Sequence, residues 1–188
     1  MNRRLLIVLA SSVLVPCWPA NGQPSALDAL ERASMRLLEW FRSLAIPLDA
    51  IVATERRAQL FNALNAFSDD LYSIEIDKSA LIQLLKRDRL NKEYIYARTG
   101  ELMRSITRSR ETLRTVGPLL RSQHALGGDE IEVLLFEAAA ARKVWVAELY
   151  AAGPEIPNRF AAVAEGERAL NALRAANAEL AKLLTRLR

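Results

Sequence analysis

The chain lacks the residues from which most catalytic and metal sites are built. Its 188 residues include one cysteine, Cys17, and one histidine, His124. Transition-metal sites and histidine-based catalytic pairs need more of these side chains than the sequence offers. Phosphate-binding glycine loops, calcium loops, haem-attachment motifs and nucleophile elbows are absent as well. We therefore expect no enzymatic activity, no cofactor and no bound metal.

Glycine and proline are also scarce, with seven residues of each, and most of them fall at a few junctions. Between the junctions, apolar residues recur every three or four positions, and the alternation typical of strands is almost missing. This pattern predicts an all-α fold, an antiparallel four- to five-helix bundle with coiled-coil-like heptad seams. We expect one domain, 23–188, with helices over 25–46, 49–87, 91–120, 129–152 and 158–187.

The first 22 residues have the composition of a secretory signal peptide. Arg3 and Arg4 precede the apolar run 5–15, which is too short to cross a bilayer. Removal of 1–22 would leave 24 basic and 22 acidic residues, a net charge of +2, and no thiol. The sequence therefore predicts an exported protein, periplasmic or extracellular.

One alternative to simple cleavage rests on Cys17. The stretch Leu14-Val15-Pro16-Cys17 resembles the signal of bacterial lipoproteins, in which the cysteine is acylated and anchors the mature protein. That pattern has a small residue before the cysteine, and Pro16 departs from it. We favour cleavage without lipid, with a lipoprotein anchored at Cys17 as the alternative.

The region 48–99 contains neither glycine nor proline and carries a heptad seam that one charged residue, Lys78, interrupts. The same phase continues downstream, so one rod over 48–116 is an alternative. The charged cluster 86–89 would interrupt such a rod, which favours a hairpin at 87–91. A break at 68–70 is the second alternative.

Two further features concern the C-terminal half. The segment 122–128, which contains His124 and ends in Gly127-Gly128, is predicted to be a loop, with Asp129 capping the next helix. In the last helix, the apolar seam includes Gly166 and Asn177. A seam asparagine can fix the register of a coiled coil, so self-association through 158–187 is an alternative to a contact with a neighbouring helix.

Basic residues are concentrated in one segment. From Lys86 to Arg121 there are ten basic and four acidic residues, a local charge of +6, which leaves −4 for the rest of the predicted mature chain. The arginines bracket the apolar seam, which favours solvent-facing flanks that pair with acidic neighbouring helices. The alternative is a contact surface for anionic groups or an acidic partner. Its candidate residues are Arg98, Arg104, Arg108, Arg110, Arg114 and Arg121.

These features favour an exported, non-catalytic interaction or scaffold protein that presents helix faces to a protein partner or an envelope component. A helical bundle that binds a small apolar or anionic ligand is the main alternative, followed by an enzyme without a local motif. We expect no nucleic-acid partner, because the mature charge is near zero and aromatic residues do not alternate with the basic ones. Peripheral contact with a membrane surface is a further alternative.

Overall fold

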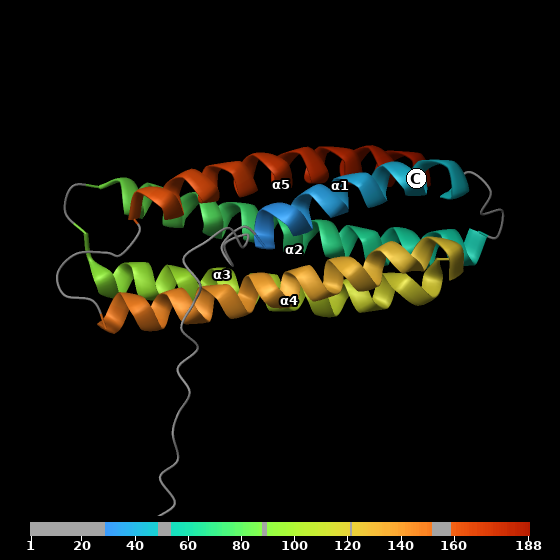
Figure 1. Cartoon of the computed structure of the whole chain (residues 1–188). Coiled ribbons are helices and arrows are strands. Elements are labelled where there is room, and N and C mark those ends of the chain that lie inside the picture. The colour runs from blue at the N-terminus through green and yellow to red at the C-terminus, as the bar shows by residue number, and fades with distance from the viewer. Residues whose placement is uncertain (1–28, 49–53, 88–89, 121, 152–158) are drawn as a thin grey trace, which may run out of the picture.

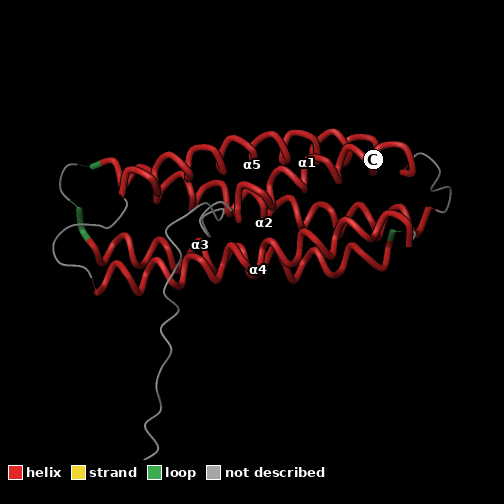
Figure 2. The backbone as a smooth tube through the Cα atoms, in the orientation of Figure 1, coloured by secondary structure: helices red, strands yellow, loops and turns green. Residues whose placement is uncertain are grey.

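The computed structural model describes residues 29–48, 54–87, 90–120, 122–151 and 159–188, without the side chains of 45–48, 54, 122–126 and 143–151. The predicted signal peptide, Cys17 and Arg121 lie outside these residues. The described chain contains helices and no strand, so the predicted all-α bundle is confirmed (Figures 1 and 2). Its α-helices are α1 (Ala29–Leu48), α2 (Thr54–Lys86), α3 (Lys92–Val116), α4 (Ser122–Ala151) and α5 (Arg159–Leu187).

The five helices form a closed ring in the order α1, α4, α3, α2, α5. Each helix packs beside its two neighbours in this order, and α1 therefore lies between α4 and α5 (Figure 1). The helices α1 and α5 run in the same direction. Glu31 of α1 pairs with Arg168, and eleven residues further along both helices Arg42 acts electrostatically on Glu179. The bundle is thus antiparallel between consecutive helices and parallel where α1 meets α5.

The predicted hairpin between α2 and α3 is present. Helix α2 ends at Lys86, α3 begins at Lys92, and the two helices pack side by side. Arg159 of α5 donates hydrogen bonds to the carbonyls of Leu85 and Arg87, at 2.5 and 2.7 Å. These bonds satisfy carbonyl groups that the helix leaves open at its C-terminus.

The start of α4 corrects the sequence prediction. The segment 122–128 is helical, so α4 begins at Ser122 and the predicted loop and Asp129 cap are wrong. The physical reason is packing: a Cβ atom on Gly127 would lie 2.5 Å from Cδ1 of Trp40, which is buried in α1. Glycine at this position allows α4 to approach the indole ring closely and does not break the helix.

Other helix boundaries differ by a few residues. Helix α1 continues through Pro47 to Leu48, where the sequence predicted an end at Ile46, and its predicted start lies outside the described residues. Helix α3 ends at Val116 and passes into a 3₁₀ turn, η2 (Gly117–Leu119). Pro118 occupies the first turn of η2, where a missing N–H group costs little.

The core runs along the axis of the ring. The predicted seam of α2 is buried throughout its length, from Leu60 to Leu85, and includes Lys78. Phe41 of α1 meets Phe67 of α2 edge-on, with ring centroids 6.2 Å apart, and joins opposite sides of the ring. Burial of each such side chain stabilises the fold by about 1.5–3 kcal/mol. No described helix contains a stretch that is long and apolar enough to cross a membrane.

Candidate functional site

Four arginines of the basic segment pair with acids of the same chain. Arg98 contacts Glu101 on the same helix at 2.6 Å, and Arg108 contacts Asp70 of α2 at 2.8 Å. Thr112 donates a second hydrogen bond to Asp70, at 2.6 Å. The contact with Asp70 agrees with the expectation that the basic flanks of α3 pair with acidic neighbouring helices, whereas the pair of Arg98 with Glu101 lies within α3.

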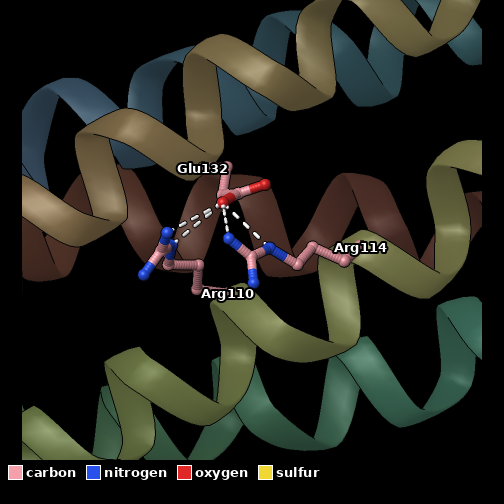
Figure 3. Close-up of polar contacts among 3 residues, drawn as sticks. All are labelled: Arg110, Arg114 and Glu132. Atoms are coloured by element: carbon pink, nitrogen blue, oxygen red, sulfur yellow. Dashed lines mark hydrogen bonds and ion pairs between the residues drawn. The ribbon is translucent and has the colours of Figure 1, made fainter.

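Two more arginines share a single carboxylate oxygen. Arg110 and Arg114, one turn apart on α3, both donate to Oε1 of Glu132 on α4, with Nε distances of 3.1 and 2.9 Å (Figure 3). Hydrogen bonds from Arg114 and then Arg110 lower the pKa of Glu132, although partial desolvation opposes the shift. The guanidinium of Arg110 also lies 5.0 Å from the ring centroid of the exposed Phe136. This cluster fastens α3 to α4.

Glu132→Gln should weaken the bundle in a pH-dependent way. The lowered pKa of Glu132 means that its contribution to stability is present above the carboxylate's unfolded-state pKa and disappears as the pH falls through the folded-state pKa. We expect the thermal midpoint at pH 7 to fall by about 1–3 °C, since Arg114 is exposed and solvent screens its ion pair with Glu132. Calorimetry at pH 7 and pH 3 measures this, and an equal difference at both pH values would contradict it.

A groove of about 530 Å³ lies between α2 and α3. We call it the α2–α3 groove, and its lining includes Ile76, Asp77, Glu101, Arg104, Arg108 and Glu111. In the ring, the pair α2 and α3 stands opposite α1. Half of the Ile76 surface is exposed, so the groove has one apolar contact point.

The charges of this groove are only partly compensated. Glu101 and Arg108 already pair with Arg98 and Asp70, and Asp77 accepts a hydrogen bond from Ser105 at 2.7 Å. Within the described part of the chain, Arg104 and Glu111 make no hydrogen bond and no close ion pair, although Glu111 interacts electrostatically with Arg114 on the same helix. The structure therefore gathers Arg104 and Arg108 from the predicted anion contacts, but surrounds them with three carboxylates. A surface for anions alone is not assembled in this groove.

The core contains a second polar site, which was not predicted from the sequence. Lys78 of α2, Arg142 of α4 and Glu165 of α5 form a buried charge cluster inside the ring. Lys78 is only 2% exposed, and Arg142 is buried as well. A Cβ atom on Gly166 of α5 would lie 3.1 Å from Cε of Lys78, so this glycine makes room for the lysine stem.

The pKa of Lys78 is set by its surroundings. Burial lowers the pKa of Lys78 well below its usual value, Arg142 lowers it further, and Glu165 acts in the opposite direction. Two signals for this cluster were visible in the sequence: Lys78 interrupts the apolar seam of α2, and Gly166 lies in the seam of α5. The sequence could not show that these two positions face each other.

Asn177 contacts a neighbouring helix of the same chain. Its Nδ2 donates to Oε2 of Glu75 on α2 at 2.9 Å, and Arg174 donates to Oε1 of the same carboxylate at 2.9 Å. This is the contact that the sequence favoured over a dimer mate. Self-association through 158–187 stays a prediction.

Within the described ranges, no three side chains of the histidine, cysteine, aspartate or glutamate type gather as metal ligands. No family model, no curated protein and no solved structure matches the chain.

Proposed function

We propose that the protein is an exported, non-catalytic interaction protein that binds a protein partner of the cell envelope or the extracellular space through the α2–α3 groove. The observation that carries the proposal is the combination, in one groove, of a half-exposed Ile76 with Arg104 and Glu111, two exposed charges that make no hydrogen bond or close ion pair within the described residues. Protein contacts commonly combine an apolar anchor with a polar rim. Export rests on the composition of 1–22.

The groove favours a protein partner over the alternative of a small apolar or anionic ligand. It is broad and open to solvent, whereas pockets for small ligands enclose most of the ligand surface. Its lining has three acidic and two basic side chains, which does not suit an anion by itself.

Site-specific crosslinking tests this proposal. A photoreactive amino acid in place of Ile76 should give a discrete adduct with an envelope protein in cells that produce the chain. Met35 of α1 is the matched control, because it is 52% exposed against 50% for Ile76 and lies on the opposite side of the ring. Adducts of equal yield at both positions, or none at Ile76, would contradict the proposal.

A substitution in the groove provides the second arm. Excess wild-type protein should suppress the Ile76 adduct, and the variant Ile76→Lys should compete at least about ten times less well, because it loses an apolar anchor and places a charge there. The fold should persist, since Ile76 is half exposed. Circular dichroism checks this, and equal competition by the variant would exclude the groove as the contact surface.

A further inference from the structure

The two uncompensated charges of the α2–α3 groove have a defined spacing. Arg104 and Glu111 are seven residues apart on α3, which places them on the same side of the helix, about 10 Å from one another along its axis. Both side chains are exposed. The pairs that Glu101 and Arg108 form with Arg98 and Asp70 leave Arg104 and Glu111 as the charges that a partner can still meet.

This spacing selects the secondary structure of the partner. A second helix that lies along the groove presents residues i and i+7 on one face at the same separation of about 10 Å. A strand places residues on one face at multiples of about 6.7 Å, and neither two nor four residues along the strand match the groove. Asp77 contacts Ser105 and Asp70 contacts Thr112, so Ile76 lies on α2 at a level between Arg104 and Glu111. A partner helix in the groove would therefore meet Ile76 between its own two charged side chains.

Building on the proposed function, we propose that the occupant of the α2–α3 groove is an α-helix of the partner protein that carries one acidic and one basic residue seven positions apart. The acidic residue lies opposite Arg104 and the basic residue lies opposite Glu111. Because both charges of the groove are exposed, such pairs contribute selectivity more than affinity. The contact is therefore specific but weak on its own.

Alanine-based helical peptides of about 20 residues test the pattern, since shorter helices are marginal in water. The matched peptide carries Glu and Lys seven residues apart around a central Leu, and a control has the same composition with the two charges nine apart, on opposite faces. Two further peptides carry Lys at both positions or Glu at both. Fluorescence anisotropy of labelled peptides, titrated with the full chain at low salt, measures each affinity.

We expect the wild-type protein to bind the matched peptide about three to thirty times more tightly than the control. Arg104→Glu should shift the preference to the double-Lys peptide, and Glu111→Arg should shift it to the double-Glu peptide. The double variant should again prefer the matched peptide, because a helix can lie in the groove in either direction. Circular dichroism verifies that each variant is folded.

Equal affinities for all four peptides, or a preference that the two substitutions leave in place, would overturn this inference. The crosslinking result separates it from the proposed function. If crosslinking from Ile76 succeeds while the peptide preferences do not move, the groove binds a partner of another charge pattern. If crosslinking fails as well, the proposed function fails too.

Discussion

Replacement of Lys78 by methionine should stabilise the bundle at pH 7 by about 1–4 kcal/mol. Replacement of buried ion pairs or triads by apolar side chains of similar volume is often neutral or stabilising by up to about 1–4 kcal/mol, because the charges no longer have to be desolvated. Methionine is unbranched, so it can follow the path of the lysine stem past Gly166. The substitution leaves Arg142 and Glu165 as one cation and one anion. Urea unfolding monitored by circular dichroism measures the change.

The pH dependence gives a second readout of the same variant. The pKa of Lys78 is lowered in the folded state, so the unfolded chain binds the extra proton at pH values between the folded pKa and about 10.4. The wild-type protein should therefore gain stability relative to Lys78→Met as the pH rises through this window. Arg142 and Glu165 are the charged groups that act on the lysine from the helices around it.

A surface substitution is the matched control. Lys182 is an exposed lysine of α5 that pairs with Glu179, and Lys182→Met should change stability by no more than about 0.5 kcal/mol. If Lys78→Met destabilises the protein by more than about 1 kcal/mol, the lysine makes a stabilising contact as an ammonium ion. That result would contradict the account of the buried charge cluster.

Alanine at Gly127 should destabilise the protein, whereas alanine at the adjacent Gly128 should stabilise it. At Gly127 the new Cβ would clash with the rigid indole of Trp40, at 2.5 Å, and overpacking of this kind costs about 1–3 kcal/mol. At Gly128 the nearest atom is 3.9 Å away, an ordinary contact. Both substitutions recover up to about 1 kcal/mol of helix propensity.

Each of these two alanine variants, at Gly127 and at Gly128, serves as a control for the other. Both residues lie in α4, so the difference between the two variants isolates the contact with Trp40 and amounts to about 1–3 kcal/mol. Thermal midpoints should differ by several degrees. Equal stability of the two variants would show that α4 does not approach α1 at Gly127, and would restore the predicted loop over 122–128.

The contrast between these glycines and the hairpin shows what the sequence could predict. The break at 87–91 follows from local information, because a charged cluster interrupts an apolar seam. Gly127 has the same local appearance as a loop glycine, and its role depends on an indole ring supplied by α1. Local rules identify where a helix is weak, but a packing partner decides whether it continues.

The candidate sites follow the same distinction. The pairing of the arginines on α3 was expected from the charge balance between segments, and the structure identifies Asp70 and Glu132 as their partners. In the buried charge cluster, Glu165 comes from α5, which packs beside α2, and Arg142 comes from α4, which does not neighbour α2 in the ring. Only the ring order brings them to Lys78.

The place of α1 in the ring has a consequence for the order of folding. The hairpin of α2 and α3 is local in sequence and can form as soon as both helices have left the ribosome, whereas the neighbours of α1 are α4 and α5. Helix α1 precedes the other described helices in the chain, and a helix in a protein gains most of its stability from tertiary packing. Helix α1 can meet α2 early through Phe41 and Phe67, but it lacks its two neighbours in the ring until α4 and α5 have been made. The ring is therefore completed by a contact between its first described helix and the two that come last in the chain, so its closing step joins segments that are far apart in the sequence.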